Sequence, residues 1–177
     1  PRHQRRHSSH EATAPTRAAV QWWEISPSGN ILQRARIDDP SGQTFYAYPS
    51  IAVNQQRDVL IGYARFSSMT YASGAYSFRA AIDAQNTLRA ETLLKAGEAS
   101  YYRSGLVTDG GVGSNRWGDY SNTVVDPSDD CSMWTIQEYS DSPADRWGTW
   151  WGKVEPSRVA PQVSMTADEI IVPEDAV

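Results

Sequence analysis

Short segments in which apolar and polar residues alternate follow one another along most of the chain, separated by turn-forming residues. An alternation with period two places successive side chains on opposite faces, which is the pattern of a half-buried β-strand. Helical periodicity is weak throughout. The pattern predicts an all-β fold, with strands at residues 19–25, 31–37, 50–54, 59–66, 75–82, 88–94, 120–126, 133–139 and 147–154.

Weak internal repeats relate these strands to one another. Tyr48–Asn54 aligns with Tyr120–Asp126, and Ile25–Ile31 aligns with Ile82–Leu88. Each identity is low, but both comparisons imply the same unit, which is an antiparallel meander of four strands. Repeated four-stranded sheets are the blades of a β-propeller.

We therefore predict a partial β-propeller of four-stranded antiparallel blades, with a β-sandwich as the alternative. Residues 19–37 would form the outer half of one blade, 49–95 a complete blade, and 119–155 the first three strands of the last blade. A propeller closes with about 4–8 blades. Residues 18–155 are thus expected to need the remaining blades or self-association, and the last blade to take its outer strand from the N-terminal strand of the whole domain.

The two ends of the chain depart from the alternating pattern. Residues 1–17 hold four arginines and all three histidines, and they are predicted to be a disordered basic leader. Residues 156–177 contain three prolines and are predicted to be a linker or the start of a following module. The N-terminus lacks the apolar segment of a signal peptide, and no stretch reaches the ~18 consecutive apolar residues of a membrane span.

Charge and cysteine content exclude several classes of function. The 177 residues carry a formal net charge of -5, which argues against a nucleic-acid partner, because such binding depends on Lys and Arg meeting phosphates. The single cysteine, Cys131, excludes an intrachain disulfide and zinc sites built on several thiolates. A Ser/His/Asp triad is excluded as well, because every histidine lies in the basic leader.

Four short stretches carry a resemblance to a known group of proteins. They are Arg116–Ser121, Val125–Asp130, Trp134–Tyr139 and Arg146–Trp150. Together they resemble the last blade of bacterial secreted sialidase-like β-propeller proteins, and the likeness extends over about residues 18–155. The resemblance implies the C-terminal blades of such a propeller and a secreted or cell-surface location.

The likeness is weak for any one activity. The Asp box that repeats in sialidases, Ser-x-Asp-x-Gly-x-Thr-Trp, is absent as such. Sialidases also need three arginines that bind the substrate carboxylate, a Tyr nucleophile paired with Glu, and an Asp that acts as the acid. This segment does not display that set of residues. We expect a ligand- or glycan-binding extracellular module, with glycans or proteins as partners. Two alternatives remain open: part of an active exo-glycosidase of the sialidase type whose remaining catalytic residues lie upstream, or a purely structural interaction module.

The longest connection between predicted strands, Gly97–Gly118, is the candidate ligand site. Connections beyond about 12–15 residues are often functional, and in a propeller this one would lie on the face around the central channel. Arginine can clamp a carboxylate, and a tyrosine ring can stack on a sugar. A mobile Gly-rich insertion is the structural alternative. The candidate ligand-binding residues are Glu98, Tyr101, Tyr102, Arg103 and Arg116.

Two further groups admit both a functional and a structural interpretation. Asp126, Asp129 and Asp130 offer oxygen ligands for calcium, the one cofactor considered. Aspartates also close tight turns through hydrogen bonds to their own backbone. Trp22–Trp23 and Trp150–Trp151 could be sugar platforms, but neighbouring strand residues face opposite ways, so one ring of each pair is expected to pack in the core.

Overall fold

The computed structural model describes residues 17–102, 116–156 and 165–170. Every regular element within these ranges is a β-strand, and the paired strands are antiparallel. The described part of the chain contains no helix of the length and apolarity that a membrane crossing requires. The predicted all-β class is therefore confirmed.

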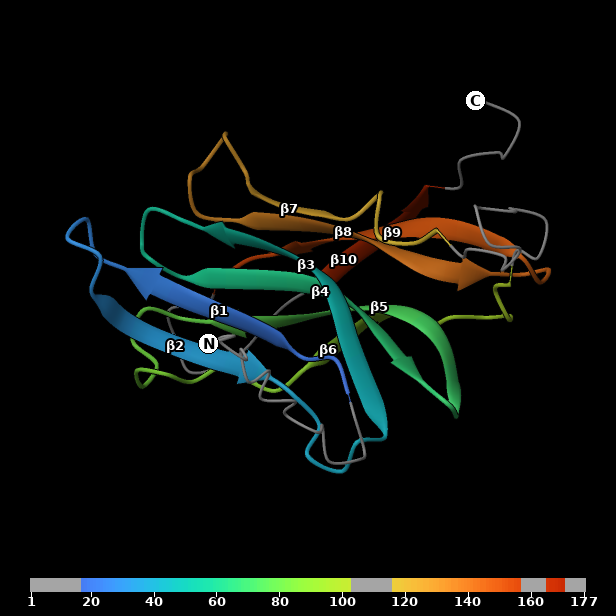
Figure 1. Ribbon diagram of the computed structural model, residues 1–177. Coiled ribbons are helices and arrows are strands. Elements are labelled where there is room, and N and C mark those ends of the chain that lie inside the picture. The colour runs from blue at the N-terminus through green and yellow to red at the C-terminus, as the bar shows by residue number, and fades with distance from the viewer. Residues whose placement is uncertain (1–16, 103–115, 157–164, 171–177) are drawn as a thin grey trace, which may run out of the picture.

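Three antiparallel sheets follow one another in the order of the chain. The first has two strands, and the other two are four-stranded meanders, β3–β6 and β7–β10. Figure 1 shows the β3–β6 sheet between the other two, in an arrangement that does not close into a ring. The strands are β1 Val20–Ile25, β2 Ile31–Ile37, β3 Thr44–Val53, β4 Val59–Ser67, β5 Thr70–Arg79, β6 Thr92–Lys95, β7 Asn122–Val125, β8 Met133–Asp141, β9 Arg146–Val154 and β10 Met165–Ile170.

β4 lies at the centre of the stack and is buried on both faces from Val59 to Ala64. Its alternate residues join two different apolar clusters. One cluster lies against the first sheet and contains Val20, Trp22, Ile37, Val59, Ile61, Tyr63 and Ala75. The other lies against the third sheet and contains Ala52, Leu60, Tyr76, Phe78, Ala80, Leu94, Met133 and Val154. The middle sheet thus shares a core with each neighbour.

One tryptophan pair divides between core and surface, whereas both rings of the other pair are partly buried. Trp22 is 6% exposed and Trp23 is 48% exposed, so the prediction for this pair is confirmed. Trp150 is partly buried and packs against the cluster that contains Met133. Trp151 lies beside Trp134, with ring centroids 5.0 Å apart. The rings therefore serve mainly to hold the sheets and strands together.

Three strands of the middle sheet differ from the prediction by several residues, and one of them is β5, which covers Thr70–Arg79 where residues 75–82 were predicted. β3 begins at Thr44, six residues earlier than predicted, because it continues through an irregularity between Ala47 and Ser50. Tyr48 has a φ of 53° there, a conformation that breaks the alternation on which the prediction rested. β6 covers only Thr92–Lys95, and not the whole predicted stretch from Leu88.

The edge of the third sheet also differs from expectation. We expected the outer strand beside β9 to come from the N-terminal strand of the whole domain. Instead, β10 pairs with β9, from Met165 opposite Val154 to Ile170 opposite Thr149. The prolines that suggested a linker flank β10 and do not lie within it, so they do not interrupt its hydrogen-bond ladder.

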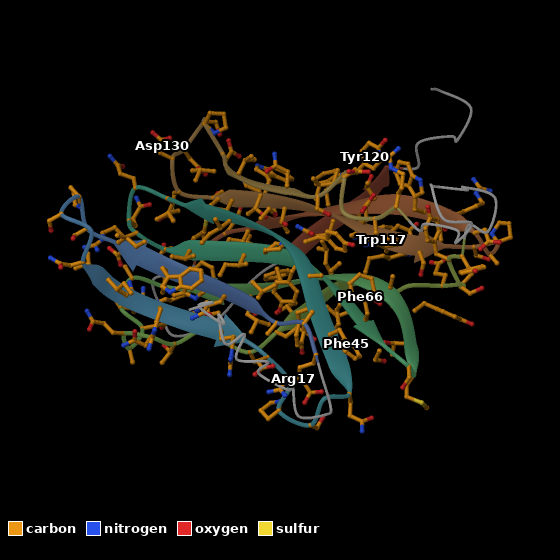
Figure 2. All side chains as sticks on the ribbon, viewed as in Figure 1. Arg17, Phe45, Phe66, Trp117, Tyr120 and Asp130 are labelled. Atoms are coloured by element: carbon orange, nitrogen blue, oxygen red, sulfur yellow. The ribbon has the colours of Figure 1, made fainter. Side chains whose placement is uncertain are left out.

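Arg17, the first described residue, belongs to the folded part of the chain and not to the predicted leader. Its guanidinium donates two hydrogen bonds to the carboxylate of Asp38, at 2.5 and 2.8 Å, and its side chain is labelled in Figure 2. Residues 1–16 of the predicted leader lie outside the described residues.

Candidate functional site

The predicted ligand loop begins after β6, and its first residues lie beside the end of β8. The backbone N–H of Glu98 donates to the carbonyl of Ser140 at 2.7 Å, and its carboxylate lies 2.8 Å from the Lys95 ammonium. The Lys95 ammonium also lies over the Trp150 ring, 4.4 Å from its centroid. Glu98 is therefore engaged within the protein, where it anchors the start of the loop.

The two tyrosines of the loop have different environments. The Tyr101 ring meets the Trp117 ring edge to face, with centroids 5.2 Å apart. The Tyr102 backbone N–H donates to a carboxylate oxygen of Asp145 at 2.6 Å, and residue 102 is 60% exposed. Tyr101 thus helps to hold the loop together, while Tyr102 is available to a ligand. Arg103 lies outside the described residues.

Arg116 is exposed and pairs with a neighbour in sequence. Its Nη2 lies 3.3 Å from Oδ2 of Asp119, and the two side chains are 73% and 53% exposed. Exposed ion pairs of this kind contribute little to stability. Because the pair is open to water, its guanidinium can exchange Asp119 for the carboxylate of a ligand without unfolding the turn.

The turn that carries Arg116 is fixed by contacts with Tyr48 and Glu138, two residues that the sequence did not single out. Gly118 has a φ of +91°, and a Cβ there would lie 2.1 Å from Cδ1 of Tyr48, so only glycine fits beneath that ring. The Gly118 N–H also donates to the carboxylate of Glu138 on β8. An acidic residue in the interior of a predicted strand was the available signal for Glu138.

Glu138 is a buried acid, only 3% exposed. Burial raises the pKa of its carboxyl group, and the negative charge of Asp119 raises it further. Hydrogen bonds from the backbone of Gly118 and Tyr120 act in the opposite direction. Glu138 therefore positions the turn by accepting a hydrogen bond from the Gly118 N–H.

Aromatic rings form two groups of contacts at this end of the molecule. Tyr48 contacts Phe66 and Phe66 contacts Trp117, with centroids 6.3 and 6.1 Å apart. Nearby, Tyr120 stacks on Trp147 at 4.4 Å and 9°. Figure 2 shows Phe66, Trp117 and Tyr120 on the same side of the structure. We call Tyr48, Phe66, Tyr101, Trp117, Tyr120 and Trp147 the aromatic row.

Two rings of the aromatic row reach solvent. Tyr48 is 44% exposed and Tyr120 is 49% exposed, and the charged pair of Arg116 and Asp119 lies in the same segment of chain. Exposed apolar surface with a polar rim is typical of interaction sites. The arrangement can accept the apolar face of a planar or ring-shaped ligand and, through Arg116, an acidic group.

The calcium candidates are engaged in the β7–β8 turn. Oδ1 of Asp126 accepts hydrogen bonds from the N–H and hydroxyl of Ser128, and its Oδ2 accepts one from Nε1 of Trp134. These bonds, chiefly that from the Ser128 hydroxyl, lower the Asp126 pKa to about 2. Asp129 bonds the backbone of the same turn, and Asp130 has a φ of 51°.

Within the ranges that the structure describes, no three His, Cys, Asp or Glu side chains are grouped as a metal site would require. Asp130 lies at the end of the molecule opposite Trp117 and Tyr120 (Figure 2). Asp126 and Asp129 close the turn through hydrogen bonds to its backbone and side chains.

A second set of buried ionisable groups lies on the middle sheet. The Tyr63 hydroxyl is 2.8 Å from the Ser77 hydroxyl and 3.3 Å from the Glu91 carboxylate. Arg65 Nε lies 3.0 Å from the other oxygen of that carboxylate. Tyr63 is fully buried, and burial raises its pKa above the ordinary value. Such a phenol is neither accessible nor easily ionised.

Comparisons of this chain with protein-family models, with curated proteins and with solved structures found no match.

Proposed function

We propose that the described strands are the C-terminal blades of a β-propeller of the secreted sialidase-like kind. The proposal is supported by the strand order, since β3–β6 and β7–β10 are both four-stranded meanders with strands in chain order. On this proposal β1 and β2 are the outer half of a preceding blade, and their inner half comes from elsewhere in the protein.

The exposed apolar surface beside β1 supports the need for further blades or self-association. Trp23, Ile51 and Val53 are each about half exposed, and a cavity of about 240 Å³ lies between β1 and β3. Within the described ranges, only β2 pairs with β1, which leaves one edge of β1 open to another strand.

Size-exclusion chromatography of the 177-residue chain tests this part of the proposal. We expect oligomers or aggregation, because apolar faces and a strand edge would be uncovered. A monodisperse monomer that unfolds cooperatively would favour the β-sandwich instead.

We propose further that this segment binds extracellular ligands, and glycans in particular, through the aromatic row and Arg116. The observation that carries this proposal is the exposure of Tyr48 and Tyr120 beside the open Arg116–Asp119 pair. Together these groups match a ligand that offers an apolar ring face and an acidic substituent.

A catalytic role would depend on residues upstream of this chain. The Tyr–Glu contact that the structure contains, between Tyr63 and Glu91, is sealed from solvent on the Tyr63 side. It therefore does not favour the exo-glycosidase alternative, and binding is the function that we propose.

Glycan-array binding by the full-length protein tests the proposed ligand class. Tyr120→Ala is expected to reduce the binding of acidic glycans, because it removes a ring that stacks on Trp147 and is open to solvent. Tyr120→Phe keeps the ring and is the matched control. Equal binding by wild type and Tyr120→Ala would contradict the proposal and favour a purely structural interaction module.

A further inference from the structure

Glu138 of β8 is a buried acid that the proposed ligand site does not use directly. The residue is only 3% exposed, and among the described residues no basic side chain forms an ion pair with its carboxylate. The hydrogen bonds to this carboxylate come from the backbone of one turn, through the Gly118 N–H and through Tyr120. Burial without a cation favours the neutral form of a carboxyl group, so Glu138 takes up a proton more readily than an exposed acid does.

The turn that is bonded to Glu138 also carries both members of an ion pair. Gly118 lies between Arg116 and Asp119 in the sequence, and Nη2 of Arg116 lies 3.3 Å from Oδ2 of Asp119. The negative charge of Asp119 raises the Glu138 pKa. Arg116 therefore neutralises the charge of the turn that opposes the ionisation of Glu138.

The other elements that pack against Glu138 bring no charge to it. In the β8–β9 ladder Glu138 is opposite Thr149, and the first charged pair beyond it is Asp141 opposite Arg146. β7 contains no ionisable side chain, and β5 meets the Glu138 backbone with a glycine. Lys95 of β6 lies over the ring of the residue that follows Glu138, which points to the other face of β8. The pair of the turn is thus the charged group that can change beside Glu138.

We propose that the engagement of an acidic ligand by Arg116 is coupled to the protonation of Glu138. This inference rests on the proposed function, because it describes how that same site responds to pH. When the guanidinium leaves Asp119 for a ligand carboxylate, the Asp119 charge is no longer neutralised, and the ligand brings a further negative charge to the turn. Both changes favour the neutral form of Glu138. A neutral carboxyl group keeps an oxygen that accepts the Gly118 N–H, so the turn is retained.

The direction of the pH dependence follows from linkage. Because binding favours the protonated form of Glu138, the complex holds more protons than the free protein, and binding must strengthen as the pH falls. The uptake of one whole proton corresponds to ~10-fold in affinity per pH unit. The increase ends where the ligand carboxylate is itself protonated. Acidic glycans are therefore bound more tightly in mildly acidic surroundings than in neutral ones.

Carbon-13 NMR of the glutamate carboxyl groups in the full-length protein tests the coupling without a ligand. Arg116→Ala leaves the Asp119 charge without its cation and should raise the Glu138 pKa, whereas Asp119→Asn should lower it. Glu138→Gln identifies the resonance. Glu155→Gln is the matched control, because it removes an exposed acid that pairs with Lys153, and it should leave the Glu138 pKa unchanged.

Isothermal titration with a hyaluronan hexasaccharide, an acidic glycan that carries glucuronate, measures the proton directly. Titrations in two buffers of different ionisation enthalpy should show proton uptake on binding. The dissociation constant should fall ~3-fold or more from about pH 7 to about pH 5.5. Both effects should disappear in Glu138→Gln and persist in Glu155→Gln.

The two experiments separate failure of the coupling from failure of the proposed function. Binding of the hexasaccharide without proton uptake, or a Glu138 pKa that Arg116→Ala does not raise, overturns the inference. The NMR result on Arg116→Ala stands even if Glu138→Gln does not fold, because Glu138 is intact in that variant. Absence of hexasaccharide binding at every pH contradicts the proposed function instead, and the NMR titration then decides the coupling alone.

Discussion

The middle sheet meets both neighbours through apolar clusters, but its interface with the third sheet also contains a close polar contact at a glycine of β4. Towards the third sheet, the β4 backbone packs closely against the Gln137 side chain at Gly62, where a Cβ would lie 2.1 Å from Nε2 of Gln137. Gln137 donates to the Thr135 hydroxyl at 2.9 Å and to the Ser50 hydroxyl at 3.3 Å. Ser50 in turn bonds Thr123 across the interface at 2.7 Å. We call this polar contact the glycine seam.

Towards the first sheet, the interface is filled by large apolar side chains. Trp22 is buried with Ile61 and Tyr63 of β4, and no glycine of β4 lies on that face. Beyond this cluster the two sheets separate around a cavity that Arg79 lines. The polar links there are made by exposed or half-buried groups, such as the pair of Glu24 and Arg57.

The difference shows two ways of joining similar sheets. The glycine seam has no space for a further side-chain atom at Gly62, so a larger residue there should destabilise the protein. The first interface is filled by large side chains, so their truncation should leave destabilising cavities. A close polar seam also leaves no room for a ligand, whereas an interface held by bulky residues at one place can leave a cavity at another.

Truncation of Trp22 is the change from which we expect the largest effect. Trp22→Ala should lower the free energy of unfolding by about 3–5 kcal/mol, because it removes a buried aromatic ring and leaves a cavity. Urea denaturation followed by circular dichroism measures this. Trp23→Ala is the matched control, since Trp23 is adjacent but about half exposed, and its effect should be much smaller. Equal losses would show that the first interface does not depend on Trp22.

The sequence predicted the strands that carry this comparison, because their alternation is regular. The predicted end points of β2, 31 and 37, agree with the structure, and the predicted start of β4 at 59 does as well. The seam itself could not be predicted. Contact between Gly62 and Gln137 depends on which faces of two distant strands meet, and an internal repeat shows only which strands are equivalent.

Added volume in the glycine seam should have the next largest effect. Gly62→Ala places a methyl group against Gln137 Nε2 and the Thr135 hydroxyl, which would lie 2.1 and 2.3 Å away. We expect a loss of about 1–3 kcal/mol in the free energy of unfolding. In a Gln137→Ala background, Gly62→Ala should lower the free energy of unfolding by less. A double-mutant cycle measures the coupling energy between the two positions. Additive losses would mean that the clash is relieved elsewhere.

The first interface should also be more sensitive to acid where Glu24 is engaged. Hydrogen bonds from Gln33 and Arg57 lower the Glu24 pKa, so its stabilising contribution is present above the unfolded-state pKa and is lost as the pH falls through the folded-state pKa. Glu24→Gln should therefore lose less stability than wild type between about pH 5 and pH 3. Urea denaturation at both pH values checks this, with the exposed Glu155→Gln as control. An unchanged pH dependence would exclude the contribution of Glu24.

The sequence singled out candidate ligand residues but not the residues that support their loop. The sequence singled out Tyr102 and Arg116 because a long loop with tyrosine and arginine is unusual in a compact β domain. It missed Tyr48 and Glu138, because their role depends on how Gly118 lies between them. The pairing of Arg116 with Asp119, three residues away, is by contrast a local contact that the sequence makes available.

Arg116 is exposed at the end of the predicted ligand loop, and its substitution should separate binding from stability. Arg116→Ala should change the free energy of unfolding by only ~0.5 kcal/mol, because the side chain is mostly exposed and its ion pair with Asp119 is open to water. In the full-length protein it should nevertheless weaken the binding of an acidic glycan, since it removes the cation beside Tyr120. Arg103→Ala should act in the same direction.

Arg116→Lys is the informative control at residue 116. It keeps the charge but loses the two-pronged geometry of guanidinium, so it should restore binding only in part. If the Ala variants at both positions bind acidic glycans as wild type does, the predicted ligand loop is not a ligand site, and the aromatic row serves only to join neighbouring strands and loops.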